Sequence, residues 1–346
     1  MHTIISLWPL WLIVGLFICT AVVIGWFGVQ MTEVARDLAH ASGIGEAVMG
    51  ALFIGAATSL SGITTSVVAA SEGFPELAIS NALGGIAAQT TFLAIADIVY
   101  RRANLEHAAA SAENLFMTGL LITLLSVHLL GVAVPELEVF WIHPASLLLL
   151  VVYIFGLRLL AQTHETPMWL PRRTSDTNTE QQSQSGNLQK SLPLMWLKFA
   201  AYALVVAAAG WSLAQLAVPL AEHTGLSQGV VGGVFTAVAT SIPELVVAVS
   251  AVRLGALNLA LGDIVGGNAF DTLFIAASDA AYREGSIYSA FSQAEVFWLA
   301  NSLLMAGVLL LGLIYRERHG PANIGVESLV ILVLYVAGLV TLSVAV

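Results

Sequence analysis

Long apolar runs, each near the length of a membrane-spanning helix, alternate with short polar segments along the chain. The runs are continuous, which favours helices over the short alternating segments of a membrane β-barrel. The pattern therefore predicts an all-α polytopic membrane protein with about ten transmembrane helices. The predicted spans cover residues 9–34, 46–70, 76–100, 114–134, 143–163, 194–221, 228–252, 258–281, 291–314 and 324–346.

One polar stretch is much longer than the others and separates the fifth predicted span from the sixth. It covers residues 164–193 and includes an unbroken polar run from Thr174 to Gly186. This composition is typical of a flexible linker. We therefore predict two transmembrane halves of five spans each, residues 1–163 and 194–346, joined by this linker.

Composition supports the membrane assignment and excludes several other classes. Of the 346 residues, 58% are hydrophobic and only 10% are charged, whereas soluble domains carry about 25% charged residues. The high apolar content makes a lipid bilayer the expected surroundings. A net charge of −10 argues against nucleic acid as a partner. Cys19 is the sole cysteine, which excludes an intramolecular disulfide and a thiolate metal cluster.

Basic residues fall almost entirely on one side of this topology. Eleven of the twelve flank the loops after odd-numbered spans, so that side is expected to be cytoplasmic, with the linker inside and both termini outside. No basic region precedes the first span, which is therefore expected to be retained. The compact chain, without a targeting segment or large insert, is expected in a bacterial-type plasma (inner) membrane. Arg283 is the exception, and the eleven are Arg36, Arg101, Arg102, Arg158, Arg172, Arg173, Lys190, Lys198, Arg253, Arg316 and Arg318.

Two parts of the chain repeat each other at an offset of 182 residues. Between positions 43 and 101 the comparison gives 21 identities in 59 positions, whereas random pairing would give roughly a quarter of that. Thr58-Ser59 matches Thr240-Ser241, for example. Because the offset is five spans, the second copy is expected to cross the membrane in the opposite sense. Such inverted repeats are typical of secondary transporters, whose sites lie near the middle of the membrane.

One repeated position suggests a structural contact. Asp97 and Asp279 each lie four residues before an arginine, Arg101 and Arg283, near a predicted helix end. This spacing fits an i,i+4 ion pair on a helix surface. We therefore expect the two aspartates to anchor the structure rather than to take part in transport.

Polar residues that could bind a cation lie in the seventh span, within Ala239-Thr-Ser-Ile-Pro-Glu244. Pro243 lacks an N–H and disrupts the helix, which makes backbone carbonyls and the hydroxyls of Thr240 and Ser241 available as ligands. A carboxylate within a span, such as Glu244, is costly unless it is paired, protonated or bound to a cation. A protonated glutamate in a helix–helix hydrogen bond is the alternative reading.

The eighth span adds two further carboxylates. Asp263 and Asp271 are eight residues apart, close to two helical turns, and so share one face. Asn268 supplies another neutral oxygen, and Gly262, Gly266 and Gly267 allow a close helix approach. Carboxylate, hydroxyl and amide oxygens are ligands for hard cations such as Ca²⁺ or Na⁺. An anion would need a basic residue at mid-span, and the sequence places none there.

The segments Thr-Ser-Ile-Pro-Glu244 and Leu-Ala-Leu-Gly-Asp-Ile-Val-Gly-Gly-Asn-Ala-Phe270 resemble the second α-repeat of the sodium/calcium exchangers, in the calcium/cation antiporter superfamily. The resemblance implies alternating access, in which Na⁺ or H⁺ is exchanged for Ca²⁺ at one central cluster. The transported cations then bind transiently and no other cofactor is expected. Carried over by motif, the ligands would include Thr240, Ser241, Glu244, Asp263, Thr58, Ser59 and Asn81.

The first repeat departs from the family pattern. Where the family has a Pro-Glu pair, this chain has Ser61-Gly62, so one acidic ligand is missing. Each close charge in a low-dielectric site is worth several kcal/mol, so Ca²⁺ binding in the usual geometry is weakened. Asp271 stands where an asparagine is usual and is a candidate to restore the charge, with Gln89 as its counterpart in the repeat. Glu72 and Glu76 lie near the outer ends of spans and are expected to be solvated.

Three functions compete at this point. The leading prediction is a secondary active cation antiporter of sodium/calcium exchanger type, moving Ca²⁺ or a related cation against Na⁺ or H⁺. The second is a monovalent cation/H⁺ exchanger on the same fold. The third is a non-transporting membrane sensor or scaffold, which the degenerate first repeat favours and the intact second repeat opposes. An enzyme is not expected because the spans contain no nucleophile–base pair and no histidine cluster. No oligomeric partner is predicted.

Overall fold

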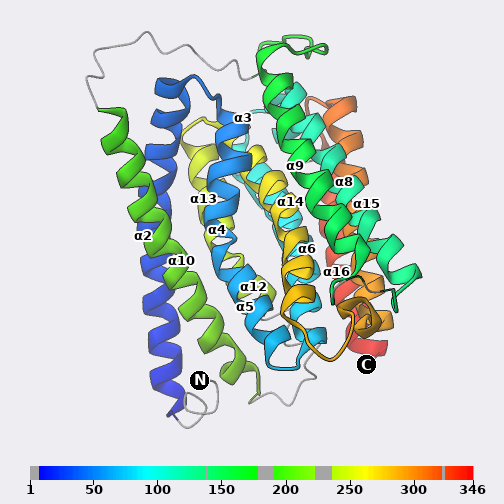
Figure 1. Cartoon of the computed structure of the whole chain (residues 1–346). Helices are drawn as coiled ribbons and strands as arrows, with labels where there is room; N and C mark the ends of the chain where they lie inside the picture. Colours follow the sequence, from blue (N-terminus) through cyan, green and yellow to red (C-terminus); the bar gives the residue numbers. More distant parts are fainter. Residues whose placement is uncertain are drawn as a thin grey trace.

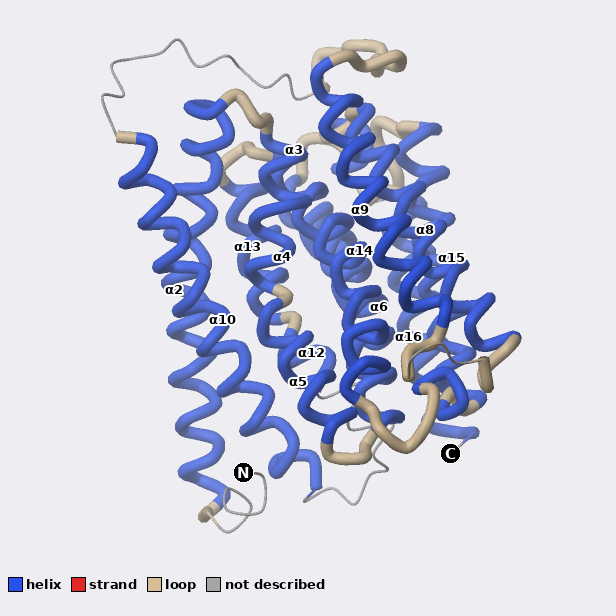
Figure 2. The backbone as a smooth tube through the Cα atoms, in the orientation of Figure 1, coloured by secondary structure: helices blue, strands red, loops and turns tan. Residues whose placement is uncertain are grey.

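The computed structural model describes residues 8–137, 139, 141–177, 191–222, 236–321 and 324–345. In these ranges every regular element is a helix, and β structure is limited to one isolated bridge between Val139 and Ile142. Figure 2 shows the helices gathered into one bundle with loops toward its two ends. Seven of them are long and apolar enough to cross a membrane. The expectation of an all-α membrane protein is therefore confirmed.

The long helices follow the predicted spans closely, with two differences. The first predicted span, 9–34, extends as a helix to Ser42, because Leu38 and Ala39 remain buried beyond the apolar run. The predicted span 228–252 is described only from residue 236, since 223–235 lie outside the described residues, as do 178–190 of the linker. The long helices are α2 (Leu10–Ser42), α6 (Pro75–Tyr100), α8 (Ala112–Ala133), α9 (Pro144–Glu165), α10 (Leu192–Glu222), α14 (Leu257–Ala281), α15 (Gln293–Tyr315) and α16 (Val326–Ala345).

Two further membrane segments are broken helices. The second predicted span consists of α3 (Glu46–Val48), the π-helix η1 (Met49–Ile54), α4 (Gly55–Thr58) and α5 (Leu60–Ser71), with a bend of 44° between its two halves. The described part of the seventh contains α12 (Ala237–Thr240) and α13 (Ile242–Arg253). Figure 2 shows both breaks near the middle of the bundle.

The two breaks arise differently although they fall at equivalent positions, Ser59 and Ser241. Pro243 lies in the first turn of α13, so the predicted disruption of the seventh span is confirmed just before it. The first repeat has no proline there. What both breaks share is a threonine hydroxyl that donates back to the helix: Thr58 to the carbonyls of Ile54 and Gly55, and Thr240 to that of Ala237, each at 3.1 Å. Such back-bonding competes with the helical ladder and bends helices.

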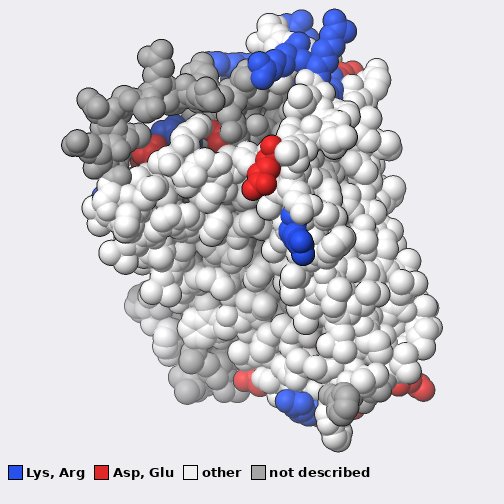
Figure 3. Space-filling model, turned by 45° about the horizontal axis from the view of Figure 1, so that its top comes forward, with Lys and Arg blue, Asp and Glu red and all other residues white. Residues whose placement is uncertain are grey.

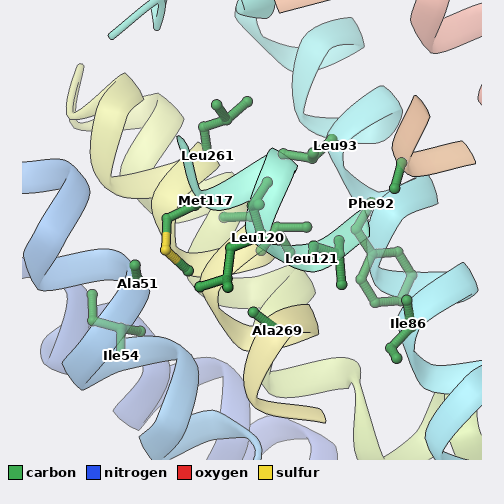
Figure 4. Packing of buried hydrophobic residues seen from close by; sticks show 14 of the residues in the cluster. Ala51, Ile54, Ile86, Phe92, Leu93, Met117, Leu120, Leu121, Leu261 and Ala269 are labelled. Carbon is green, nitrogen blue, oxygen red and sulfur yellow. The ribbon is translucent and has the colours of Figure 1, made fainter. Parts of the chain in front are cut away.

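Helices α6 and α14 form the centre of the bundle. In the most apolar 18-residue stretch of each helix, 89% of α14 is buried, compared with 17% of α2. Figure 1 shows α2 and α10 side by side at one edge, with α8, α9, α15 and α16 at the other. Figure 4 shows the apolar side chains that η1, α6, α8 and α14 contribute to the core, including Ile54, Ile86, Leu121 and Leu261.

The first broken helix packs against α14 at backbone distance. A Cβ atom added to Gly50 would lie 2.5 Å from the carbonyl oxygen of Leu259, and one added to Gly55 would lie 2.6 Å from the amide nitrogen of Gly267. From the other side, Gly262 and Gly266 have no room for a Cβ beside Ala47 and Ala51. The predicted close approach at these two glycines is confirmed. It brings the breaks and the polar residues of α14 together.

Asp97 and Asp279 anchor loops, but not through the predicted ion pairs. Among the described residues neither forms an ion pair with Arg101 or Arg283, and Arg101 itself ends α6 with a left-handed φ of 58°. Instead, each carboxylate accepts two backbone N–H groups. The donors are Leu105 (2.7 Å) and Gly325 (2.8 Å) for Asp97, and Ile287 (3.1 Å) and His143 (2.7 Å) for Asp279. The expected i,i+4 ion pairs do not form, because backbone N–H groups of the loops already donate to both carboxylates.

The two ends of the bundle differ in charge. Figure 1 shows that α2 begins and α16 ends at one end, whereas α9 ends and α10 begins at the other. The segment 172–177, which follows α9, lies at this second end and contacts Arg316 and Arg318. Figure 3 shows Lys and Arg side chains gathered mainly toward the upper end of the visible face, with a broad area below them on which charged side chains are sparse. We call the end of the bundle at which α9 ends and α10 begins the linker face.

Candidate functional site

A small pocket lies in the core between the two helix breaks. Its wall combines α4–α5 and α6 of the first repeat with α12–α13 and α14 of the second. The residues that line it are Ser59, Gly62, Asn81, Gly85, Gln89, Thr240, Ser241, Glu244, Asp271 and Phe274. Apart from the two glycines and Phe274, every lining side chain carries an oxygen ligand, and none is basic.

Glu244 projects into this pocket from the first turn of α13. It is 1% exposed. Its Oε1 accepts a long hydrogen bond of 3.5 Å from the Ser59 hydroxyl. Its Oε2 has no partner among the described residues. A buried carboxylate with an open oxygen is stabilised by a proton or a cation.

Asp271 approaches the pocket from α14 and meets its own repeat counterpart. The Gln89 amide donates to Asp271 Oδ2 at 2.6 Å and to the Ser241 hydroxyl at 3.2 Å. This places Asp271 opposite the first repeat, where the missing glutamate would have brought a charge. Its Oδ1 faces no partner among the described residues, so one oxygen is left for a ligand.

Asp263 lies in the same helix but does not line the pocket. It is fully buried, and neither carboxylate oxygen has a partner in the described part of the chain. Asp271 and Glu244 are both close enough to interact with it electrostatically. No three acidic or histidine side chains among the described residues converge on a single point as a preformed metal centre would require. In this conformation a cation would therefore be held by one or two carboxylates together with neutral oxygens.

The neutral oxygens predicted from sequence divide into three groups. Ser59, Thr240, Ser241 and Asn81 line the pocket. Thr58 does not line it, and its hydroxyl donates to the backbone carbonyls of Ile54 and Gly55.

Asn268 lies away from the pocket, because its amide donates to the Thr90 hydroxyl at 2.9 Å. Its Oδ1, the predicted ligand atom, is buried without a partner among the described residues, so its role as a ligand stays a prediction. Asn81 lines the pocket and also ties α6 to α5, because its amide donates to the Gly62 carbonyl at 3.2 Å and to the Ser66 hydroxyl at 2.9 Å.

Phe274 is the pocket residue that sequence reasoning missed. A Cβ atom added to Gly62 would lie 2.5 Å from Phe274 Cε2, so the aromatic ring fills the space that a side chain at position 62 would need. The available signal was its position three residues after Asp271, on the same face of a helix. Glu72 and Glu76 are exposed, as predicted, and do not line the pocket.

Comparison with known proteins places the chain in a family. The profile of the sodium/calcium exchanger proteins matches residues 12–161 and 194–344. The chain belongs to this family. Its two matched segments leave out residues 162–193, close to the predicted linker.

Individual relatives are more distant. The sodium/calcium exchanger MaX1 of Methanosarcina acetivorans is 33% identical over 122 residues, which cover 35% of this chain and 33% of that protein. The inner membrane protein YrbG of Escherichia coli is 27% identical over 136 residues, or 39% of this chain and 42% of that protein. The matches thus span less than half of these relatives. A structure of the sodium-calcium exchanger NCX_Mj has a TM-score of 0.69 at 18% identity and covers 96% of this chain and 98% of that one, which shows a shared fold.

Proposed function

We propose that the protein is a secondary active cation antiporter that moves Ca²⁺ or a related cation against Na⁺ or H⁺. One observation carries this proposal. Three buried carboxylates, Glu244, Asp263 and Asp271, have open oxygens among neutral oxygen ligands in the core of the bundle. Membership of the exchanger family supports the same function.

The mechanism follows from competition for these oxygens. A cation neutralises Glu244 and Asp271 while the hydroxyls of Ser59 and Ser241 replace part of its hydration shell. Because both ions need the same carboxylates, one must leave before the other binds, which couples their movements. The breaks at Ser59 and Ser241 let the helix halves on either side of the pocket move separately. Opening toward one face and then the other would then give alternating access.

We further propose ten spans in two inverted repeats of five, with domains 1–163 and 194–346 joined by the linker 164–193. The contacts of Asp97 and Asp279 support this symmetry, because their donors are themselves 182 positions apart: Leu105 with Ile287, and His143 with Gly325. The pairing of Gln89 with Asp271, also 182 apart, fits a pseudo-two-fold axis through the pocket.

The orientation and location are part of the same proposal. The linker face carries most of the basic residues and is assigned to the cytoplasm by the positive-inside rule. Both termini then face outward, in a bacterial-type plasma membrane. A relative described as an inner membrane protein supports this location.

Isotopic Ca²⁺ uptake into Na⁺-loaded proteoliposomes tests the proposed function. Removing one buried charge partner costs about 3–5 kcal/mol, so Glu244→Gln and Asp263→Asn should each lower uptake by at least about a hundredfold. Glu76→Gln, the same change at an exposed position, should leave uptake unchanged. Undiminished uptake in both Glu244→Gln and Asp263→Asn would show that the site lies elsewhere.

A monovalent cation/H⁺ exchanger is the second candidate, and Gly62 favours it. The ring of Phe274 occupies the space that a side chain at position 62 would need. A site with one carboxylate fewer suits a monovalent cation better than a divalent one. The two candidates separate in the same vesicles. Na⁺- or K⁺-driven acidification without Ca²⁺ uptake would select the monovalent exchanger, whereas Na⁺-driven Ca²⁺ uptake would reject it.

A further inference from the structure

A second buried acidic site lies at the linker face, apart from the central pocket. Glu106 projects from α7 (Leu105–Ala108), the short helix between α6 and α8, and Glu327 lies in the first turn of α16. Glu106 is 0% exposed and Glu327 is 7% exposed. The two residues come from distant parts of the sequence, so their pairing joins a loop of the first repeat to the last helix.

The open oxygens of this pair face each other. Glu106 Oε2 and Glu327 Oε1 both lack a partner among the described residues. A Cβ atom added to Gly325 would lie 3.3 Å from the first and 3.0 Å from the second, so both oxygens border the same small space. The two side chains are also within hydrogen-bonding reach of each other. Two ionised carboxylates cannot bond one another, whereas a single proton gives both oxygens a partner.

Among the described residues, no basic side chain forms an ion pair with either carboxylate. The Ser328 hydroxyl donates to Glu106 Oε1 at 3.2 Å, and both oxygens of Asp97 are already taken by backbone amides. Arg316 turns away, donating to the carbonyls of Arg172 and His107. The charged groups that act on the pair are Asp97 from α6 and Glu317 from the loop before α16. The neighbouring His107 of α7 bonds Thr174 and a backbone carbonyl instead, and Asp176 of the linker pairs with Arg318.

This environment favours the protonated form. Burial raises the pKa of Glu106 well above its usual value, and the charges of Asp97 and Glu327 raise it further. A divalent metal is a poorer occupant, because Ca²⁺ takes 6–8 oxygen ligands and the pair offers two open ones. The described residues also hold no group of acidic and histidine side chains suited to a metal ion.

The pair has no counterpart at the other end of the molecule. At an offset of 182, Glu106 matches Tyr288 and Glu327 matches Ala145, although Asp97 and Asp279 keep equivalent contacts. The fold is thus built at the opposite face without acidic residues at these two positions. The pair is therefore specific to the linker face rather than a requirement of the repeat.

A segment of the linker lies over this region. We call residues 172–177 the linker strap. His107, next to Glu106 in sequence, bonds the Thr174 hydroxyl at 2.8 Å, and Arg316 bonds the Arg172 carbonyl at 2.8 Å. Arg318 pairs with Asp176. The strap, α7 and the start of α16 are thus joined through neighbours of the acidic pair.

We propose that Glu106 and Glu327 form a second ion-binding site that holds one shared proton and thereby keeps α7 and the linker strap packed against α16. The proton-bound pair carries one negative charge. Loss of the proton leaves two like charges side by side in a buried position, which pushes α7 away from α16. The strap, attached through His107 and Arg316, then loosens with it.

The direction of the pH effect follows from the raised pKa. A carboxyl whose pKa is higher in the folded state contributes stability that is complete below its ordinary pKa and is lost as pH rises through the raised value. The linker face should therefore loosen on the alkaline side. Glutamine mimics the protonated carboxyl, so Glu106→Gln should remove this dependence on pH.

Two measurements on the full-length protein in lipid nanodiscs test the proposal without requiring transport. Infrared spectroscopy should detect a protonated carboxyl that persists above the ordinary glutamate range and disappears in Glu106→Gln and in Glu327→Gln. Hydrogen exchange of residues 172–177, corrected for intrinsic rates, should accelerate about tenfold or more as that proton is lost, since such pairs interact by over about one pK unit. Glu165→Gln, at an exposed position at the end of α9, is the matched control and should behave as the wild type.

Three results would overturn the proposal. The first is a wild-type protein with no protonated carboxyl assignable to this pair. The second is strap exchange that follows intrinsic rates at every pH, which the wild type alone can show if a variant does not fold. The third is a thermal shift produced by Ca²⁺ in Glu244→Gln but lost on adding Glu106→Gln, which would make the pair a metal site.

Discussion

Gly62 and Phe274 show how the volume of one side chain has been exchanged for another across the pocket. The ring fills the space beside the glycine, and the carboxylate that remains nearby comes from Asp271 on the facing helix. The packing beside Gly62 thus comes from the ring of Phe274, and the carboxylates of the pocket come from the second repeat.

This exchange predicts a non-additive pair of substitutions. Gly62→Glu alone should overpack against Phe274 and destabilise the protein by about 1–3 kcal/mol. Combining it with Phe274→Ala makes room for the new carboxylate, so the double variant should bind Ca²⁺ more tightly than the wild type. Thermal unfolding and Ca²⁺ titration measure the two effects. Equal destabilisation in the single and double variants would show that the ring does not oppose the side chain.

The sequence predicted the acidic residues of the site better than its shape. Glu244 and Asp263 were identified because carboxylates within apolar spans are costly and therefore conspicuous. Phe274 was not, because an aromatic residue in an apolar helix is ordinary until the missing side chain opposite it is seen. Asn268 was assigned to the cluster by residue type, but its contact with Thr90 depends on helix rotation, which the sequence does not specify.

Among the elements, α14 and the first broken helix depend most on one another. Their backbones meet at Gly50 and Gly55, so a methyl group at that contact must push the helices apart. Gly50→Ala should therefore lower the free energy of unfolding by about 1–3 kcal/mol. Gly307→Ala in α15 is the matched control, since a Cβ there meets nothing within 4 Å. A melting temperature equally unaffected in both variants would contradict the close packing.

The two helix breaks were not equally predictable. Pro243 marked the second, because proline cannot continue a helix. The break at Ser59 has no such mark and follows only from the repeat. The anchoring role of Asp97 was predicted, but not its contacts, because a spacing of four residues points along the helix whereas its donors come from two loops.

The whole molecule makes a topological prediction. If the linker face is cytoplasmic, a membrane-impermeant thiol reagent should label Glu72→Cys in intact spheroplasts and label Arg173→Cys only after permeabilisation. Both positions are exposed, and Cys19 is first replaced by alanine so that each variant has one thiol. The reverse pattern would invert the orientation, and labelling of both positions without permeabilisation would rule out the three spans, or any odd number, between them.

The central claim is that Glu244, Asp263 and Asp271 hold the transported cation. Equilibrium binding of isotopic Ca²⁺ to the purified protein, with Na⁺ as competitor, tests it most directly. We expect saturable binding that Na⁺ displaces, and a loss of at least about a hundredfold in affinity in Glu244→Gln. Binding of any cation that is equally strong in the wild type, Glu244→Gln and Asp263→Asn would contradict the account.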